Sequence, residues 1–484
     1  MKWWLAFAAC AGCDRVPALP EAVPGARIGN VELGQRYYEV RSLLGAPSTE
    51  PVTLVRLGHA RWSEPPIDVL FTSPDETTLT DGAVVIGVGQ TVSASRDTVE
   101  SKYGTSTDRY NGHDYYANGL AVDYGDDDVA DRIAVFTPPS EPRTGIDALS
   151  TLSEGVVLDG RRIPVVDMHL HPGEYADMAA EGRAFIAANL PPDLQIYAPD
   201  LLDRLSDPWA RHIGIAEQTA LAGVEHAVLF AVYAPHSTGV FSNQALVAIL
   251  DDARNRTADG TPWAWGLASL DFEGWTPEVG VARITELRDL LARRPDRIIG
   301  IKLAHAHQGV RLDDPAYFEV YAIAAQARVP VLLHTGFSPF PGTRDEPDYY
   351  DPAHLESVLA AHPDLDVVLS HIGQGDARAV RHALELAASH ERVWLELSAL
   401  GRPSLVDEAG APASSTEPQY PMVLAEIRRR GLIGRTLFAT DGPQYSGAIR
   451  NYLRRLVDGM KTAGYSTEEI EAVLSRNFRR LFRR

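Results

Sequence analysis

Cysteine is nearly absent from this sequence, and the two cysteines present, Cys10 and Cys13, both lie within the first 13 of its 484 residues. The rest of the chain can therefore form no disulfide bond and no cysteine-ligated metal site. Basic residues are also in deficit, because 45 Lys and Arg stand against 65 Asp and Glu, which gives a net charge of -20. A chain this acidic repels phosphate backbones, so we expect no nucleic acid partner.

The apolar run at the N-terminus is too short to span a bilayer as a helix. Residues 1–12 place one Lys before this run and small residues after it, which is typical of a secretory signal peptide. The sequence Cys10-Ala11-Gly12-Cys13 resembles a bacterial lipobox, whose second cysteine carries the lipid. We therefore expect lipidation at Cys13 and anchoring to a membrane of the bacterial cell envelope, on its periplasmic or extracellular side. A soluble secreted protein with an ordinary cleavage site is the alternative.

Residues 13–27 are rich in proline, which predicts an extended tether. A weak internal repeat follows over residues 28–138. Two helical patterns, at residues 34–45 and 93–104, are each followed by two strand-like runs, so the predicted unit is a helix and an antiparallel hairpin, present twice. This plan resembles the duplicated modules of small envelope lipoproteins and of the beta-lactamase inhibitor protein, which implies binding or spacing, with an envelope protein as one partner. Residues 139–161 are predicted to be a linker.

Apolar runs alternate with helical patterns over residues 162–484. This alternation predicts β-α units around a parallel sheet. Eight runs are predicted to be strands: residues 163–169, 226–233, 263–270, 298–303, 329–334, 366–371, 393–397 and 436–440. Eight strands fit a (β/α)8 TIM barrel, so the predicted fold is α/β with an N-terminal α+β domain. An open doubly wound sheet is the alternative, but its Gly-rich phosphate turn is missing after the first strand.

The first strand of the barrel ends in Asp167-Met168-His169-Leu170-His171. Successive side chains of an extended chain point to opposite faces, so His169 and His171 should share one face with Asp167, and Met168 should share the other with Leu170. Two imidazoles would then converge on one point. A pair of core or solvated histidines is the alternative interpretation.

Further polar residues fall at the carboxyl ends of later strands: His334 on the fifth, His371 on the sixth and Asp441 after the eighth. The carboxyl ends of the strands of a closed barrel surround one mouth, where barrel enzymes carry their chemistry. Imidazole and carboxylate are ligands for Zn²⁺ or another divalent ion. We therefore predict a metal site at this mouth, with one ion per chain, His169, His171, His334 and Asp441 as ligands, and His371 either as a further ligand or beside the ion.

At these residues the chain resembles the amidohydrolase superfamily, and within it the amidohydrolase 2 family, whose relatives include aminocarboxymuconate-semialdehyde decarboxylase. The resemblance covers residues 162–484. It rests on five strand ends: Asp167-Met168-His169-Leu170-His171, Gly300-Ile301-Lys302-Leu303, Val331-Leu332-Leu333-His334-Thr335-Gly336, Leu369-Ser370-His371-Ile372-Gly373 and Ala439-Thr440-Asp441-Gly442-Pro443.

The resemblance implies that Asp441 binds the metal and also accepts a proton from the activated water. His371 either ligates the metal or acts beside it as a general acid/base. Lys302 has two possible interpretations. It is either a carbamylated lysine that bridges two metals, or a cation that pairs with a carboxylate of the substrate or of a neighbouring residue. His305 and His307 are expected to face the substrate or the solvent.

The leading hypothesis is a metal-dependent hydrolase of a C–N or C–O bond, in an amide, cyclic amide or lactone. A metal-dependent nonoxidative decarboxylase of a small carboxylic acid is the alternative enzyme, and a non-catalytic envelope binding lipoprotein is the alternative of another class. The small-molecule substrate should be selected by three long loops at the mouth, residues 172–215, 337–353 and 401–421. The sequence is compatible with a homo-oligomer as well as with a monomer.

Overall fold

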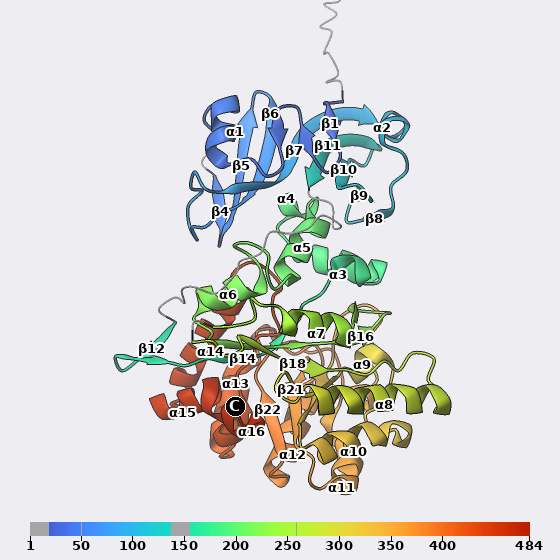
Figure 1. Cartoon of the computed structure of the whole chain (residues 1–484), viewed down its shortest axis with the longest axis vertical. Coiled ribbons are helices and arrows are strands. Elements are labelled where there is room, and N and C mark those ends of the chain that lie inside the picture. Colours follow the sequence, from blue (N-terminus) through green and yellow to red (C-terminus); the bar gives the residue numbers. More distant parts are fainter. Residues whose placement is uncertain (1–18, 50, 137–154, 258) are drawn as a thin grey trace, which may run out of the picture. The chain divides into compact units, whose positions relative to one another are not determined.

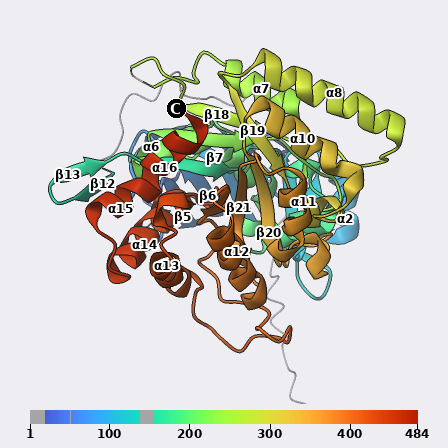
Figure 2. The same cartoon turned by 90° about the horizontal axis from the view of Figure 1, so that it is seen from below.

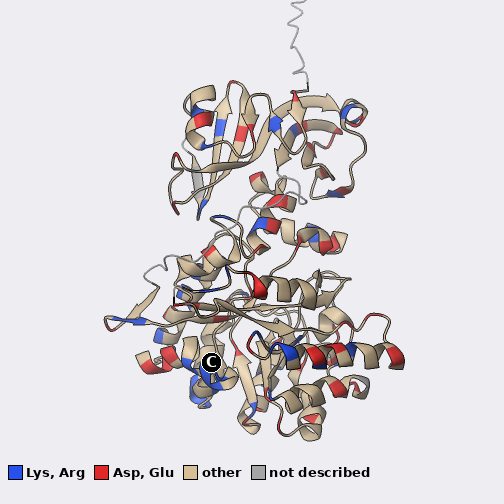
Figure 3. Ribbon diagram, in the orientation of Figure 1, with Lys and Arg blue, Asp and Glu red and all other residues tan. Residues whose placement is uncertain are grey.

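The computed structural model describes residues 19–49, 51–136, 155–257 and 259–484. The chain divides into two compact units, one of Met1–Glu141 with Pro192–Asp200 and one of Pro142–Pro191 with Leu201–Arg484. The predicted signal peptide, the lipidation site Cys13 and most of the predicted linker lie outside the described residues. Within the described ranges, no helix combines the length and the apolar composition needed to cross a bilayer. Residues of both charge signs are scattered over each unit (Figure 3).

The first unit is built on an eight-stranded antiparallel sheet in the order β4-β5-β6-β7-β11-β10-β9-β8 (Figure 1). Its first half contains α1 (Tyr37–Leu44), β4 (Val52–Leu54), β5 (Leu57–Ser63), β6 (Pro66–Thr72) and β7 (Val84–Ser95). Its second half contains α2 (Arg96–Tyr103), β8 (Asp108–Tyr110), β9 (His113–Tyr116), β10 (Leu120–Tyr124) and β11 (Val129–Phe136). Each helix is thus followed by four strands, two more than the sequence patterns indicate. A small sheet of β1 (Ala22–Val23), β2 (Arg27–Ile28) and β3 (Val31–Glu32) begins within the segment predicted to be a tether.

The first unit also takes in residues 192–200, which follow the first barrel strand in the sequence and include α4 (Pro192–Gln195). Tyr197 of this segment is 1% exposed and its ring lies against β7. A Cβ added at Gly87 would lie 2.6 Å from the ring, and one added at Gly89 would lie 2.8 Å from the hydroxyl. The hydroxyl donates a hydrogen bond of 2.9 Å to Asp68 on β6. The two glycines therefore provide the space that the tyrosine fills.

Replacing Tyr197 with alanine is expected to destabilise the first unit by about 3–5 kcal/mol, the usual cost of truncating a buried aromatic side chain. The measurement is amide hydrogen exchange of β6 and β7, because it reports the stability of this unit separately from the barrel. Tyr38→Ala is the matched control, since Tyr38 on α1 is 50% exposed and its loss should cost less than about 0.5 kcal/mol. Equal protection of β7 in the two variants would contradict the packing role of Tyr197.

The second unit is an eight-stranded parallel barrel whose strands are neighbours in chain order. They are β14 (Val166–Leu170), β15 (His226–Phe230), β18 (Ala264–Ala268), β19 (Ile298–Leu303), β20 (Val331–Gly336), β21 (Val367–Gln374), β22 (Val393–Glu396) and β23 (Thr436–Leu437). A parallel bridge between Leu170 and Gly442, just past β23, closes the sheet. The predicted (β/α)8 barrel is confirmed, and the open doubly wound sheet is excluded.

Helices lie between and after these strands in the sequence, and several of them surround the sheet (Figure 2). They are α3 (Ala180–Ala187), α5 (Ala198–Ser206), α6 (Ile215–Ala222), α7 (Asn243–Asp251), α8 (Pro277–Arg293), α9 (His305–Gln308), α10 (Phe318–Ala327), α11 (Glu356–Ala361), α12 (Ala377–Ser389), α13 (Tyr420–Arg429), α14 (Ala448–Thr462), α15 (Thr467–Glu471) and α16 (Asn477–Phe482). Two hairpins lie outside the barrel sheet, one of β12 (Val156–Leu158) and β13 (Arg161–Ile163), the other of β16 (Val232–Ala234) and β17 (Gly239–Phe241).

The barrel has two hydrophobic layers. The larger cluster packs the strands against the surrounding helices. The smaller cluster takes at least one residue from each of the eight strands, so it fills the interior of the barrel, and Phe478, Leu481 and Phe482 of α16 pack into it. Polar side chains replace this apolar filling toward the carboxyl ends of the strands, which is where the predicted metal ligands lie.

Candidate metal centre

His169 and His171 lie at the carboxyl end of β14, with their rings 4.5 and 5.0 Å from the ring of Phe230 on β15. The prediction that Met168 and Leu170 share a face is wrong, because Met168 packs inside the barrel and Leu170 packs in the outer layer. The pairing of β14 with β15 shifts register at this point, which interrupts the strict alternation. The two histidines nevertheless meet, with their Nε2 atoms 3.1 Å apart.

Asp167 does not join the histidines. Its fully buried carboxyl group accepts hydrogen bonds from Thr440 N (3.1 Å), Thr440 Oγ1 (2.6 Å) and His169 N (3.2 Å). Burial raises the pKa of Asp167 to about 7, although these hydrogen bonds act in the opposite direction. Asp167 thus ties β14 to the chain after β23, which places the next residue, Asp441, beside His169.

Asp441 adopts a left-handed backbone conformation with φ of 62°. Its Oδ1 lies 3.0 Å from His169 Nε2 and 3.1 Å from His171 Nε2. Burial acts to raise the pKa of Asp441, but the imidazole of His169 and the hydrogen bonds with His169 and His171 outweigh it and hold this pKa well below its usual range. The carboxylate is therefore ionised. The side chains of His171 and Asp441 are 38% and 26% exposed, so this edge of the group opens to solvent.

The spacing of these three atoms fits one divalent ion. His169, His171 and Asp441 form a group whose ligand atoms all lie within 4.8 Å of one another, and the separations just given are 3.0–3.1 Å. Ligands at right angles around an ion about 2.1 Å away would lie about 3.0 Å apart. Two imidazole nitrogens and one carboxylate oxygen are also the donor types that Zn²⁺ and similar ions take. The group leaves further positions for water or substrate.

His334, the third predicted histidine ligand, lies buried on β20 and outside this tight group. Its ring is 4.8 Å from the ring of His371. Its Nε2 is buried and has no hydrogen-bond partner among the described residues. Burial, reinforced by neighbouring imidazoles, holds the pKa of His334 well below its usual value, so the ring is neutral. A buried neutral imidazole with an unused nitrogen is suited to metal ligation.

His371 lies near the end of β21, with its ring 4.9 Å from that of His169. Its Nδ1 is 2.7 Å from Ser398 Oγ, so one ring nitrogen is committed to the protein. Burial holds the pKa of His371 well below its usual value, although the Asp441 carboxylate acts to raise it. His371 is therefore neutral near pH 7.

Lys302 on β19 is 3% exposed, and its Nζ donates a hydrogen bond of 3.1 Å to Ser370 Oγ. Burial lowers the pKa of Lys302 to about 8, although Glu396 and Asp441 act to raise it. Of the residues that the structure describes, no Asp or Glu pairs with this ammonium group within 4.0 Å. An ion pair between Lys302 and a neighbouring carboxylate, which was one interpretation of this lysine, is therefore not present among the described residues.

The two histidines after Lys302 occupy different surroundings. His305 is 1% exposed and its Nε2 lies 3.1 Å from the hydroxyl of Tyr321, so the expectation that it faces substrate or solvent is wrong. His307 is half-buried, with its Nδ1 3.1 Å from Ser237 Oγ and its ring 4.8 Å from that of His334.

A family model described as amidohydrolase matches residues 166–484, which contain every residue of the group. The chain belongs to the amidohydrolase family. No curated protein matches the chain.

Solved structures similar to this amidohydrolase include an uncharacterised TIM-barrel protein from Bordetella bronchiseptica, with 18% identity over 66% of this chain and 99% of that chain and a TM-score of 0.46. A probable 2-pyrone-4,6-dicarboxylic acid hydrolase from Acinetobacter baumannii has 18% identity over 66% and 100%, with a TM-score of 0.41. A 5-carboxyvanillate decarboxylase from Novosphingobium aromaticivorans, complexed with manganese, has 14% identity over 69% and 100%, with a TM-score of 0.46. These low identities indicate no substrate for this amidohydrolase.

The amidohydrolase barrel contains one site residue that the sequence patterns did not identify. Glu396, the last residue of β22, is fully buried, and its carboxylate lies in a second group of possible ligand atoms with His169 and His371. The available signal was a single acidic residue, Glu396, within the otherwise apolar run 393–397. The predicted seventh strand thus also contributes a polar residue at its carboxyl end.

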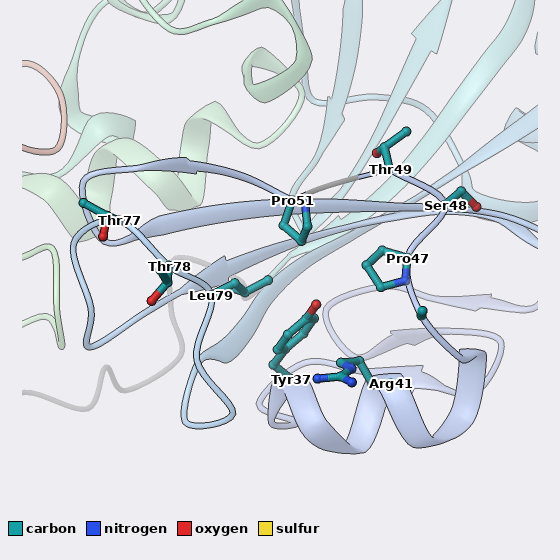
Figure 4. Close-up of a pocket in the computed structure, with 10 residues that line it drawn as sticks. Tyr37, Arg41, Pro47, Ser48, Thr49, Pro51, Thr77, Thr78 and Leu79 are labelled. Carbon is teal, nitrogen blue, oxygen red and sulfur yellow. The ribbon is translucent and has the colours of Figure 1, made fainter.

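The first unit has a hollow of about 450 Å³ between α1, the segment from α1 to β4 and the loop from β6 to β7 (Figure 4). Arg41 and Tyr37 point toward it from α1, and Thr77 and Thr78 line its other side. The side chain of Arg41 is 51% exposed and lies 4.0 Å from Asp81. A charged side chain this exposed to solvent contributes little binding energy. We therefore place the candidate chemistry of this amidohydrolase in the barrel.

Proposed function

We propose that the amidohydrolase barrel binds one divalent metal ion and hydrolyses a C–N or C–O bond of a small organic substrate, in an amide, cyclic amide or lactone. The observation that carries this proposal is the convergence of His169 Nε2, His171 Nε2 and Asp441 Oδ1 at separations of 3.0–3.1 Å. His334 is the fourth proposed ligand, through its unpartnered Nε2.

A divalent ion held by this group would supply Lewis acidity and bring the pKa of a water molecule toward neutrality. The ionised carboxylate of Asp441 can accept a proton from the attacking water. The neutral ring of His371 can take up a proton at its Nε2 and transfer it to the leaving nitrogen or oxygen. Lys302 can hold the substrate through a carbonyl or carboxylate oxygen, because its buried ammonium group has no acidic partner of its own within 4.0 Å among the described residues.

Lys302 also favours the second candidate function, a nonoxidative decarboxylase of a small carboxylic acid. A buried cation beside the metal group is suited to a substrate carboxylate. We propose the one-ion form of the site for both candidate functions, because the ligand atoms of His169, His171 and Asp441 gather around one point and the Nζ of Lys302 donates a hydrogen bond to Ser370.

The test is a screen of the purified protein, loaded with Zn²⁺ or Mn²⁺, against lactones, amides and aromatic acids, with carbon dioxide release measured in parallel. Metal-dependent ring opening or amide cleavage supports the hydrolase, and carbon dioxide release supports the decarboxylase instead. If the protein holds less than one tightly bound ion per chain and turns over no substrate, the non-catalytic binding protein becomes the better interpretation.

A further inference from the structure

We propose that Glu396 is a positioning residue that orients two histidines of the metal centre and sets which of their ring nitrogens carries the proton. The inference rests on the metal site of the proposed function, but not on which bond is cleaved. The residues involved come from three strands of the barrel: Glu396 ends β22 and Ser398 follows it, His371 lies near the end of β21, and His169 lies near the end of β14.

The carboxylate of Glu396 is fully buried and its oxygens are occupied by donors. Its Oε1 accepts a hydrogen bond of 3.1 Å from Ser398 N, and its Oε2 accepts one of 3.1 Å from His371 N and one of 2.8 Å from Ser398 Oγ. A buried carboxylate with several donors is held in one orientation. Glu396 is therefore a fixed acceptor beside the two histidines.

This arrangement decides the proton on His371. The hydroxyl of Ser398 has one hydrogen, which it donates to the carboxylate of Glu396, an acceptor-only group. The same oxygen lies 2.7 Å from His371 Nδ1, so it must accept there, and Nδ1 must carry the proton. In the neutral ring of His371 the lone pair is then on Nε2, as a proton acceptor requires.

The same carboxylate faces His169 from the side opposite the metal group. Glu396 Oε2 lies 3.4 Å from His169 Nδ1, and His169 Nδ1 makes no hydrogen bond to any other described residue. His169 Nε2 is the atom that lies 3.0 Å from Asp441 Oδ1. A negative charge next to Nδ1 favours the proton there, which leaves the Nε2 lone pair for an ion. One carboxylate thus presents the Nε2 atoms of both histidines as lone pairs.

The main test is Glu396→Gln, which replaces an acceptor oxygen by a donating amide without changing the size of the side chain. We expect the dissociation constant for Zn²⁺, measured by competition with a chelator, to rise by about 10- to 100-fold, the usual cost of losing a residue that orients a metal-bound histidine. The visible spectrum of the Co²⁺-loaded variant should also change, because the orientation of the ligands changes. Glu391→Gln is the matched control, since Glu391 is exposed just before β22, and it should behave as the wild type.

A second variant keeps the inference testable if Glu396→Gln fails to fold. Ser398→Ala removes the link to His371 but leaves Glu396 beside His169, so Zn²⁺ affinity should stay within about threefold of wild type. The pH profile of turnover on any substrate found in the screen should shift, and Ser398→Thr should restore it. Wild-type Zn²⁺ affinity and an unchanged Co²⁺ spectrum in Glu396→Gln, or a tenfold loss of affinity in Ser398→Ala, would overturn the positioning role and leave the proposed function standing. A wild-type protein that binds no divalent ion would overturn both.

Discussion

Replacing Asp441 with asparagine is expected to reduce metal-dependent turnover by at least about 10³-fold, because the amide can neither accept the proton of the attacking water nor provide a charged ligand. The carboxylate of Asp441 is shared between His169 and His171 at 3.0 and 3.1 Å. Its loss should therefore also lower the metal content below one ion per chain. Turnover is measured as kcat/KM on a substrate from the screen, and metal content by elemental analysis of the purified protein.

The control for this variant is Asp458→Asn on α14, where the side chain is 76% exposed and its nearest cation, Lys461, is 3.9 Å away. Both variants should keep the thermal unfolding transition within a few degrees of wild type, because Asp441 lies at the open edge of the group and not in the packed interior. An Asp441→Asn protein that keeps its ion and its turnover would remove the basis of the proposed mechanism.

The barrel could be predicted from the sequence because each of its strands is an apolar run of suitable length. The ends of these runs change abruptly to polar residues, as in Val331-Leu332-Leu333-His334 and Leu437-Phe438-Ala439-Thr440-Asp441. Parallel strands in a barrel bring such ends together, so the meeting of His169, His171 and Asp441 follows from topology once the sheet closes. The distances between side chains do not follow in the same way, so the sequence alone does not show that His169, His171 and Asp441 lie closer together than His334 does.

Three features could not be predicted from the sequence. The register shift at β14 depends on how that strand pairs with β15, and a pattern within one strand carries no information on its partner. Glu396 ends its strand as many solvent-facing glutamates do, and its burial becomes evident only when Ser398 and His371 are placed around it. The association of residues 192–200 with the first unit depends on Gly87 and Gly89, whose missing side chains leave the space for Tyr197.

Replacing His371 with asparagine is expected to lower turnover by about 10²- to 10⁴-fold, the range for losing a general acid/base, while one ion per chain is retained. The reason is geometric. Nδ1 of His371 contacts Ser398, and His371 is not one of the three residues of the group His169, His171 and Asp441, so we propose proton transfer through Nε2 as its task. The measurements are kcat and KM against pH, together with metal content.

The two roles of His371 predict different outcomes for this variant. If His371 moves the proton, the ion stays, kcat falls and its dependence on pH flattens, because asparagine does not titrate. If His371 is a ligand, metal content falls together with activity, and added Zn²⁺ restores part of the turnover. His390→Asn is the matched control, because His390 contacts Glu356 on the outside of the barrel at 3.0 Å and has no part in the group. Loss of the ion from His371→Asn, with His390→Asn unaffected, would move His371 from proton transfer to metal binding.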